Sequence, residues 1–508
     1  MKPFIQQTLV AAVLVSNSIG IAGANEFPML ESMIEEIKLA SGLPSGTAVA
    51  VIKENRVIYE GYFGYADLAK TQRVDKNTVF YIASSTKPFF ALNALLMQAK
   101  GEFDTAKTLQ DMFPDIAFKD FDAKLVTGRD LLVHTSGIDN VPLVWATAYT
   151  GIHDTASRNS LVTESYSNSD AAPGEFSYTN VGYNIFSVWL DQKSGQPWQT
   201  LLRNNIFSPL GMAHTSAYMS DAEKNNWTLA RPYSAMNSSQ EDMLYLEKTD
   251  QTMHAAGGMI STARDLSSFI IAELNHGTVN DMVVLPPEVI AESHHQQATT
   301  DASYNDFQRD GYAWGWYTGE YKGERMLHHF GGFAGFHAHL SFIPELGVGL
   351  IVLNNEDFVS SKLTNLVADY VYGVLLNEED NEGRVGEKSE VLIQRLGSLG
   401  KMAAAQRQNI MNREWHLSQP MVNYAGVYAN NLLGNIKVRV AGSSMKLTWG
   451  NLQTVATAYE QPDTVRVEFV PNSGQVLKFE AVHDKPDTII FEGIRFERTK
   501  KIRRLGSE

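Results

Sequence analysis

The sequence predicts an α+β protein with an antiparallel sheet flanked by helices and an all-helical region, followed by a small C-terminal β-barrel. Strand-like segments stand at both ends of the region from about residue 28 to about residue 376, with helical patterns between them. Past Pro420, apolar and polar residues alternate with a period of two, which is typical of a barrel or sandwich. The length of 508 residues gives room for two to four domains at ~100–200 residues each.

The composition excludes several classes of protein. A chain that is 44% hydrophobic and 19% charged can bury a large core, so it is neither disordered nor fibrous. The absence of cysteine excludes disulfides, thiolate catalysis and cysteine-ligated metals. With 42 Lys+Arg against 57 Asp+Glu, the net charge of -15 argues against nucleic acid and anionic membranes as general partners.

Residues 1–24 have the pattern of an export signal. Lys2 supplies a positive start, residues 9–15 are apolar, and a small-x-small cleavage site ends at Ala24. The apolar stretch is shorter than the ~20 residues that span a membrane comfortably. We therefore expect cleavage after Ala24, a periplasmic or secreted protein and no stable membrane insertion afterwards. A retained N-terminal anchor is the alternative.

The first elements of the mature chain are a helix and a hairpin. Apolar residues at helical spacing predict a helix over residues 28–39, and Gly42 offers a stop. Residues 47–53 and 56–63 then read as two strands joined at Glu54-Asn55. This pair is expected to form one edge of a sheet.

A long middle region alternates loops with helical pieces, and a second strand pair follows it. These strands are predicted over residues 337–343 and 348–354, and a closing helix runs from Asp357 to about Leu376. Because strands stand at both ends of the domain, we expect them to form one antiparallel sheet.

The remaining chain divides into a linker and a second domain. A charged stretch through Glu390 looks like a domain edge, and a helical pattern follows up to about Trp415. We therefore divide the chain into a domain over residues 25–380, a helical linker over 381–418 and a β-barrel over 419–508.

Ser84 and Lys87 carry the first chemical signal. Ser84 stands at the start of a helical pattern that Gly101 ends, and Lys87 returns to the same side one turn later. Free backbone N–H groups and the positive end of the helix dipole suit a nucleophile whose attack generates an oxyanion. A desolvated lysine can lose its proton and act as a base. The ordinary alternative is a capping serine beside a solvated lysine.

Two further segments carry chemistry-bearing residues. Tyr178 and Asn180 stand immediately before a helical pattern, and His329 opens the glycine-rich run that contains Gly331 and Gly332. The ordinary alternatives are a core tyrosine with an N-capping asparagine, and a turn with a surface histidine.

Taken in order, Ser84-x-x-Lys87, Tyr178-x-Asn180 and His329-x-Gly331 resemble the motifs of the penicillin-recognising serine hydrolases. The nearest branch contains class C β-lactamases, D-Ala-D-Ala carboxypeptidases and D-aminopeptidase-like enzymes. Supporting similarity lies in residues 131–137, 209–212 and 257–266. The resemblance implies a β-lactamase/transpeptidase-like domain, with a lipocalin-like domain appended to it.

The resemblance also implies roles. Ser84 would be acylated, Lys87 would activate it, and Tyr178 would exchange protons with the serine, the leaving group and water. Since a phenol has a pKa of ~10, cations or hydrogen bonds would have to favour its phenolate form. Asn180 would bind Lys87 and the substrate amide. The oxyanion hole would consist of the backbone N–H groups of Ser84 and Gly332. Neither a metal nor another cofactor is expected.

The third motif departs from that of β-lactamases. His329 stands where they carry lysine, and Phe330 replaces a hydroxyl residue that would bind the substrate carboxylate. With an ordinary pKa of ~6.5, His329 is mostly neutral at neutral pH. We still assign His329, Gly331 and Gly332 to substrate binding, but expect weak recognition of a free carboxylate.

Other candidate sites are weaker. No G-x-S-x-G motif is present, so an α/β-hydrolase nucleophile is not supported. His337 and His339 share one face of a predicted strand and could bind a metal, but two histidines on a solvent face are favoured. Residues 134–137 are assigned a structural role and no chemistry.

The function expected is that of an exported serine hydrolase that forms an acyl-serine intermediate on small amides or peptides. Peptides of the D-amino-acid or peptidoglycan type are favoured substrates. The alternatives are a carboxylesterase or weak class C-type β-lactamase and, more remotely, a non-catalytic protein that binds cell-wall fragments. The expected partner is a small molecule or short peptide, and self-association stays open. A role as a lid over the active site is favoured for the barrel.

Overall fold

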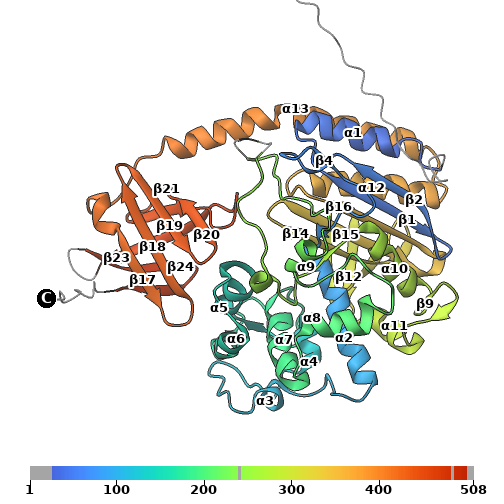
Figure 1. Cartoon of the computed structure of the whole chain (residues 1–508), viewed down its shortest axis with the longest axis horizontal. Coiled ribbons are helices and arrows are strands. Elements are labelled where there is room, and N and C mark those ends of the chain that lie inside the picture. The colour runs from blue at the N-terminus through green and yellow to red at the C-terminus, as the bar shows by residue number, and fades with distance from the viewer. Residues whose placement is uncertain (1–25, 238, 240–241, 482–484, 500–508) are drawn as a thin grey trace, which may run out of the picture.

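A computed structural model describes residues 26–499 apart from 238, 240–241 and 482–484 (Figure 1). The predicted export signal and its cleavage site lie outside the described residues. The structure consists of an α+β part and a nine-stranded barrel-like sheet, and the long helix α13 (Asn381–Met411) runs between them. In the described part of the chain, no helix combines the length and the apolar character needed to cross a membrane.

An eight-stranded antiparallel sheet forms the centre of the first part, in the order β11-β12-β13-β14-β15-β16-β1-β2. Its strands are β1 (Thr47–Lys53), β2 (Arg56–Phe63), β11 (Ala298–Tyr304), β12 (Phe307–Tyr312), β13 (Tyr317–Tyr321), β14 (Glu324–Phe333), β15 (Phe336–Ile343) and β16 (Val348–Asn354). β1 pairs with β16, Thr47 opposite Asn354, which confirms the predicted sheet built from both ends of the domain.

Both faces of this sheet are covered. Ala50 and Ile52 on β1 belong to one buried cluster, whereas Val49 and Val51 belong to another. α10 (Ala263–Leu274) packs on the first face, and α1 (Leu30–Ser41), α12 (Ser360–Leu375) and α13 lie on the other (Figure 1). A strand buried on both sides is apolar at successive positions, as in β16.

The predicted starts and stops of several elements are confirmed. α1 ends before Gly42, whose φ of 72° is the left-handed conformation that glycine tolerates best. The β1–β2 hairpin turns through Glu54 and Asn55 with φ values of 50° and 60°. β15 and β16 match the predicted second pair within one residue.

Two expectations about elements are wrong. The first is the middle region, which also contains β11–β14; β12 and β13 include glycine and charged residues and lack a clean alternation. The second is the charged stretch through Glu390, which is helical from Asn381 onward. Charged residues do not interrupt α13 because few of its side chains are buried, among them Val385 and Leu396, and the others face solvent or the domain surface.

The helical region lies beside the sheet and holds the other half of the site. Its main helices are α2 (Lys87–Ala99), α4 (Gly128–Leu132), α5 (Val141–Trp145), α6 (Thr155–Val162), α7 (Val181–Ser194) and α8 (Trp198–Leu202). Aromatic rings of α2, α7 and α8 pack edge to face: Phe90 lies 6.1 Å from Phe186 and 5.8 Å from Trp198 between ring centroids. This packing fixes α2, which starts at the site, against α7.

The C-terminal sheet has nine strands in the order β20-β19-β18-β17-β25-β24-β23-β22-β21. They are β17 (Gly426–Asn430), β18 (Gly434–Ala441), β19 (Ser444–Trp449), β20 (Leu452–Val455), β21 (Thr457–Ala458), β22 (Thr464–Val467), β23 (Gln475–Ala481), β24 (Pro486–Phe491) and β25 (Ile494–Arg498). Ile436 and Val438 are buried, whereas the intervening Lys437 is exposed, as the period of two predicts. The sheet is nearly closed into a barrel.

The barrel packs against the helical region. Trp145 of α5 lies 5.3 Å from Trp449 and 5.1 Å from Phe491 between ring centroids, and its indole N–H donates to Glu492 over 2.8 Å. The backbone N–H of Asn451 donates to the carbonyl of Thr150 over 2.9 Å. The barrel therefore holds the short π-helix η2 (Ala146–Thr150) in place.

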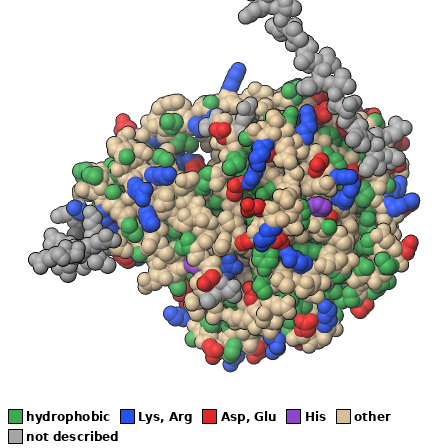
Figure 2. All heavy atoms as spheres, in the orientation of Figure 1, with side chains coloured by type: hydrophobic (Ala, Val, Ile, Leu, Met, Phe, Trp, Pro, Cys, Tyr) green, Lys and Arg blue, Asp and Glu red, His purple; other side chains and the backbone are tan. Residues whose placement is uncertain are grey.

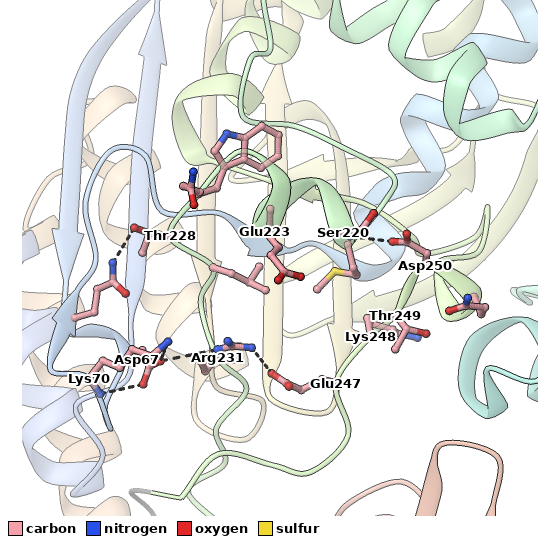
Figure 3. A pocket seen from close by; sticks show the side chains of 17 residues that line it. Asp67, Lys70, Ser220, Glu223, Thr228, Arg231, Glu247, Lys248, Thr249 and Asp250 are labelled. Carbon is pink, nitrogen blue, oxygen red and sulfur yellow. Dashed lines mark hydrogen bonds and ion pairs between the residues drawn. The ribbon is translucent and has the colours of Figure 1, made fainter.

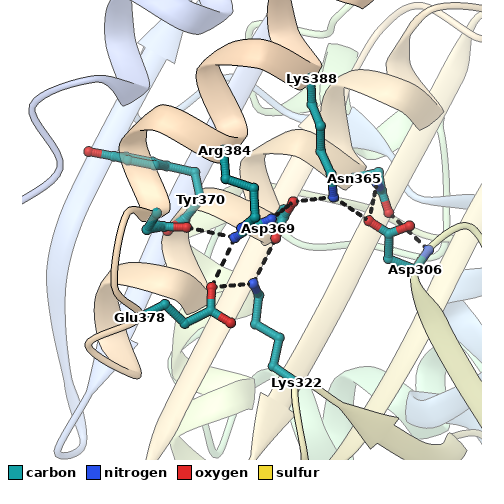
Figure 4. A network of polar contacts seen from close by, with 9 residues as sticks. Asp306, Lys322, Asn365, Asp369, Tyr370, Glu378, Arg384 and Lys388 are labelled. Atoms are coloured by element: carbon teal, nitrogen blue, oxygen red, sulfur yellow. Dashed lines mark hydrogen bonds and ion pairs between the residues drawn. The ribbon is translucent and has the colours of Figure 1, made fainter.

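Charged side chains of both signs are interspersed on the face shown in Figure 2, and a well-connected group of ion pairs is centred on Asp369 (Figure 4). Asp369 is 2% exposed and lies 2.7 Å from nitrogens of Lys322, Arg384 and Lys388. Burial alone raises the pKa of this carboxyl, but hydrogen bonds from the three cations outweigh burial and hold the pKa well below its usual range. The group ties β13–β14, α12 and α13 together.

We expect Asp369→Ala to lower the free energy of unfolding by about 3 kcal/mol, because three cations lose a buried partner. The loss is not larger because two of these cations, Arg384 and Lys388, are partly exposed to water. Urea unfolding measures this change. Because the pKa of Asp369 is lower in the folded than in the unfolded protein, its contribution to stability is complete above the unfolded pKa of ~3.9. This contribution is lost as the pH falls below that value towards the folded-state pKa. Asp306→Ala, which removes a half-exposed partner of Lys388, is the control and should cost less than ~1 kcal/mol. Equal losses of unfolding free energy in the two variants would contradict the view that Asp369 is the centre of this group of ion pairs.

Candidate active site

Ser84 and Lys87 lie where a short 3₁₀ turn, η1 (Ala83–Thr86), leads into α2. Ala83 has a φ of 46°, which is unusual for a residue other than glycine, so the chain turns sharply just before the serine. Ser84 is partly exposed, whereas Lys87 is the first residue of α2 and is completely buried. The helix predicted to start at Ser84 is present, but Ser84 lies in the 3₁₀ turn and the α-helix itself begins three residues later.

The Lys87 amine has three hydrogen-bond acceptors. Its Nζ lies 3.1 Å from Ser84 Oγ, 2.9 Å from Asn180 Oδ1 and 2.8 Å from the carbonyl oxygen of Ala256. All three acceptors are uncharged, and none of the carboxylates among the described residues forms an ion pair with this lysine. Burial therefore lowers the pKa of Lys87 well below its ordinary value, which makes the neutral amine accessible.

Tyr178 and Asn180 meet this pair from the segment before α7. Asn180 occupies the N-cap position of α7, but its side chain makes no capping bond and its Oδ1 accepts from Lys87 instead. The Tyr178 ring centroid is 4.7 Å from Lys87 Nζ, and the phenol shares a hydrogen bond with Ser84. Tyr178 is 38% exposed, so it is not a core aromatic residue. The structure thus brings Ser84, Lys87, Tyr178 and Asn180 together.

The protonation state of Tyr178 differs from our expectation. Burial of the hydroxyl group, although part of the ring is exposed, raises its pKa well above the ordinary value, and Tyr317 and Tyr183 raise it further. The hydrogen bond to Ser84 and the positive charge of Arg309 act in the opposite direction but do not outweigh these effects. The phenol therefore keeps its proton at neutral pH, and Lys87 is the group suited to accept one.

Strand β14 runs directly beside η1. A Cβ atom on Gly331 would lie 1.9 Å from the carbonyl oxygen of Ile82 and 3.1 Å from the nitrogen of Ser85, so only glycine permits this approach. At Gly332 nothing lies within 4 Å of the equivalent position, and the residue is exposed. The close approach at Gly331 therefore brings the open backbone of Gly332 to the edge of the site.

His329 is buried, with 1% of its surface exposed, so its interpretation as a surface histidine is wrong. Burial lowers its pKa well below the ordinary value, and the charge of Lys87 lowers it further. Nδ1 lies 2.8 Å from the carbonyl oxygen of Phe330 and Nε2 lies 3.3 Å from the Tyr312 hydroxyl. The neutral ring thus donates through Nδ1 and accepts at Nε2, and it brings no positive charge to the site.

The profile of the protein family described as Beta-lactamase matches residues 37–369. The chain belongs to the beta-lactamase family. It is 27% identical over 339 residues to the unguisins hydrolase UngD of Aspergillus violaceofuscus, a match that covers 62% of this chain and 59% of the relative. It is 24% identical over 327 residues to penicillin-binding protein 4* of Bacillus subtilis, covering 62% and 68%.

Among solved structures, the octameric penicillin-binding protein homologue from Pyrococcus abyssi has the same fold, with a TM-score of 0.59 and 21% sequence identity. That match covers 92% of this chain and 99% of the other, and so includes both parts of the molecule. The matches to the two named relatives cover less of those proteins. The chain spans about three fifths of the length of the fungal protein and two thirds of the length of the bacterial one.

In this member of the beta-lactamase family, a permanent positive charge that sequence analysis missed lies near Tyr178. The Arg309 guanidinium carbon is 3.6 Å from the centroid of the Tyr317 ring, which stacks 5.8 Å from the Tyr178 ring. Arg309 also donates from Nε to His328 Nε2 over 3.1 Å. No motif marks Arg309, because it lies on β12, a strand that was not predicted.

His134, to which no chemistry was assigned, supports the same tyrosine. Its ring centroid lies 4.5 Å from that of Tyr178, and its Nδ1 accepts the backbone N–H of Thr179 over 3.3 Å. Burial lowers its pKa well below the ordinary value, so it is neutral. In this family member, His134 thus positions the loop that presents Tyr178, which agrees with a structural role.

A contact between η2 and the end of β14 involves Tyr149, Phe333 and Lys248. Tyr149 of η2 stacks on Phe333 with 5.8 Å between ring centroids, and Lys248 Nζ lies 3.8 Å from the Phe333 ring. Lys248 donates to the carbonyl of Ala148 over 2.7 Å, and burial lowers its pKa well below the ordinary value. Because the barrel contacts η2, Tyr149 of η2 links the barrel to Phe333, the residue that follows Gly332.

A polar cavity of about 760 Å³ lies elsewhere on the domain (Figure 3). Arg231 lies between the carboxylates of Glu247, at 2.7 Å, and Asp67, at 3.9 Å, and Lys70 approaches Asp67 to 3.3 Å. These charges compensate one another. Lys248 lines this cavity, but Ser84, Lys87, Tyr178 and Asn180 do not, so it is not the reaction centre.

The prediction that His337 and His339 lie on a solvent face is wrong. They are 5% and 0% exposed, because helices cover both faces of the sheet. His337 contacts the Tyr304 and Thr364 hydroxyl groups at 3.3 Å each, and His339 contacts Ser341 Oγ at 2.7 Å. Within the described ranges, no three His, Cys, Asp or Glu side chains gather into a group that could hold a metal ion.

Proposed function

We propose that this protein is a serine hydrolase that forms an acyl-enzyme intermediate on Ser84. The observation that carries the proposal is the position of a fully buried lysine amine 3.1 Å from the Ser84 hydroxyl oxygen. A lysine with a lowered pKa beside a serine is a known arrangement for activating a nucleophile. Membership of the beta-lactamase family and the similarity to a named hydrolase support the same chemistry.

The proposed reaction starts when Lys87 accepts the Ser84 proton as Oγ attacks the substrate carbonyl carbon. The backbone N–H groups of Ser84 and Gly332 stabilise the resulting oxyanion. The protonated Tyr178 gives its proton to the leaving group and regains one from Lys87. In deacylation, water attacks the acyl carbon, its proton passes to Lys87 through Tyr178, and Ser84 recovers its own as the acid leaves.

The preferred substrate we propose is a small amide or peptide, with D-amino-acid or peptidoglycan-type peptides favoured. Neutral His329 supplies no charge for a free carboxylate, and Phe330 is buried with its ring 4.2 Å from that of Tyr304. A carboxylesterase or a weak β-lactamase is the second candidate. A non-catalytic protein that binds cell-wall fragments would not need the contacts between Ser84, Lys87 and Tyr178.

A substrate panel tests this proposal. We expect D-aminoacyl p-nitroanilides to give a higher kcat/KM than nitrocefin, and p-nitrophenyl esters to report the acyl-enzyme without defining specificity. Turnover of esters alone would favour the esterase. Wall-fragment binding without turnover of any member would favour the non-catalytic protein.

The pH dependence of acylation should report Lys87. Because burial lowers its pKa, the neutral amine forms well below the ordinary value, and kcat/KM should rise with pH and level off long before about pH 10. His134 and His329 are already neutral and should add no step near pH 6.5. The measurement is kcat/KM for an uncharged ester from about pH 5 to about pH 10. A rate still rising at the upper end would indicate an ordinary lysine and contradict this role.

We further propose that the chain is exported and that its folding units follow the predicted boundaries 25–380, 381–418 and 419–508. The barrel acts as a lid in this proposal. Contacts of Asn451 with Thr150, and of Tyr149 with Phe333, support it, because they link the barrel to the rim of the site.

A further inference from the structure

We propose that a cavity beside Gly332 binds a primary ammonium group of the substrate, with Asp357 as its counter-charge. This inference rests on the proposed function and names its substrate class. The cavity has a volume of about 420 Å³ and reaches from Gly332 and Phe333 to Asp357. The barrel loop of residues 470–472 forms its far wall, and Asn472 Nδ2 donates to Ser234 Oγ over 3.3 Å.

Asp357 is the one carboxylate among the described residues that line this cavity, and no described lysine or arginine lines it. It is partly exposed and forms no ion pair with another described residue. It accepts the Gly335 N–H over 2.9 Å and a bond from the Ser234 hydroxyl. Burial, followed by the neighbouring Glu356, raises its pKa to about 6, as expected of a carboxyl without a compensating cation.

The neighbouring carboxylate is already occupied. Glu356 is 2% exposed and accepts backbone N–H groups at the start of α12, including those of Phe358 at 2.8 Å and Ser360 at 2.9 Å. It also accepts the Ala235 N–H over 3.1 Å. Asp357 is therefore the acid that is left to face a ligand.

The other walls favour a cation rather than an anion or an apolar group. The rings of Tyr304, Phe333, Phe336 and Phe358 line the cavity, and aromatic faces attract ammonium groups. His337 brings no positive charge, because burial lowers its pKa to about 4. An anionic substrate group would be repelled by Asp357, and an apolar one would leave it uncompensated.

The position of the cavity defines which amine it takes. Gly332 is proposed to hold the substrate carbonyl oxygen, so a group in the cavity belongs to the acyl half of the substrate, close to the scissile bond. The volume of about 420 Å³ is at the small end for ligand sites, and the barrel loop of residues 470–472 borders it on one side. The substrates are therefore amides whose acyl part is one amino acid with a free amino group, and the enzyme releases that N-terminal residue.

The test compares an aminoacyl p-nitroanilide with its N-acetyl counterpart, each as both enantiomers, in the full-length wild type and in Asp357→Asn. The wild type should favour the free amine by kcat/KM. Asp357→Asn keeps an acceptor for the Gly335 N–H but loses the charge, so it should lose on the order of 100-fold on the free amine and less than about 3-fold on the acetylated compound. Asp301→Asn, at an exposed position on β11, is the control and should change neither.

Three results would overturn the inference. One is a wild type that prefers the acetylated compound or cleaves neither compound. The others are an Asp357→Asn variant that keeps the wild-type preference for the free amine, or one that loses kcat/KM equally on both compounds. The wild-type comparison decides even if the variant does not fold, which its Tm would reveal. Fluorophosphonate labelling of Ser84 separates the two proposals. Labelling that persists while the amine preference is absent rejects only the ammonium site, whereas absence of labelling rejects the hydrolase itself.

Discussion

Replacing Ser84 with alanine should lower kcat by on the order of 10⁴-fold or more, since no acyl-enzyme can form without Oγ. The fold should be unaffected, because Ser84 is partly exposed and its removed hydroxyl bonds only to Lys87 and Tyr178 in the site. The measurement is steady-state turnover of an activated ester, together with the Tm of both proteins. A variant that retains more than about one tenth of wild-type turnover would mean that another group is the nucleophile.

The adjacent serine provides a matched control. Ser85 is fully buried, and its hydroxyl has no hydrogen-bond partner among the described residues. Ser85→Ala should therefore leave turnover within about 3-fold of the wild type, because a buried hydroxyl without a partner contributes neither to the site nor to stability. A loss as large as that of Ser84→Ala would show that the effect comes from the turn η1 rather than from the nucleophile.

Replacing Lys87 with methionine should slow acylation by about 10³- to 10⁴-fold, because the site loses the amine that is suited to accept the Ser84 proton. Methionine has a similar length and needs no hydration, so the buried position can accommodate it. The acceptors on Asn180 and Ala256 lose their donor, which should cost about 1–3 kcal/mol of stability. Single-turnover acylation and Tm measure the two effects separately.

The second buried lysine of the site region is the control. Lys248 also has a lowered pKa, but it donates to Ala148 and lies against Phe333 rather than beside the Ser84 oxygen. Lys248→Met should change acylation by less than about 10-fold. If Lys248→Met abolished acylation and Lys87→Met did not, the result would show that Lys248, and not Lys87, accepts the Ser84 proton.

Local sequence patterns predicted the elements in which buried residues recur at regular intervals along the sequence. The β1–β2 hairpin, β15, β16 and the C-terminal strands were found because apolar runs or alternating residues end at clear turns. β11–β14 were missed because their pairing depends on neighbours from the same sheet more than on their own composition. The helical pattern of α13 was recognised only after Glu390, because the first turns of the helix carry charges, which a helix tolerates as readily as a loop.

The residues of the site that belong to sequence motifs could be predicted, and those outside the motifs could not. Ser84 and Lys87 are one helical turn apart, so local geometry already joins them, whereas Tyr178 and Asn180 could be connected with them only through resemblance to a family. Arg309 was missed because it reaches the Tyr178 environment through a stack on Tyr317 that only the folded sheet creates. Nor can a sequence show that burial raises a phenol pKa.

Histidines show the same limit. His337 and His339 alternate as residues on one strand face do, and that face was expected to contact solvent. In the structure α12 covers it, and Thr364 of that helix contacts His337. A period of two indicates which residues share a face, but whether a second layer covers that face depends on distant parts of the chain.

The central claim is that an activated oxygen on Ser84 attacks the substrate, and covalent labelling of the full-length wild type tests it most directly. The protein is incubated with a fluorophosphonate, and intact mass followed by peptide mapping locates the adduct. We predict one adduct per chain, located on Ser84, absent from Ser84→Ala and formed much more slowly in Lys87→Met. An adduct on another residue, or none in the folded wild type, would contradict the account.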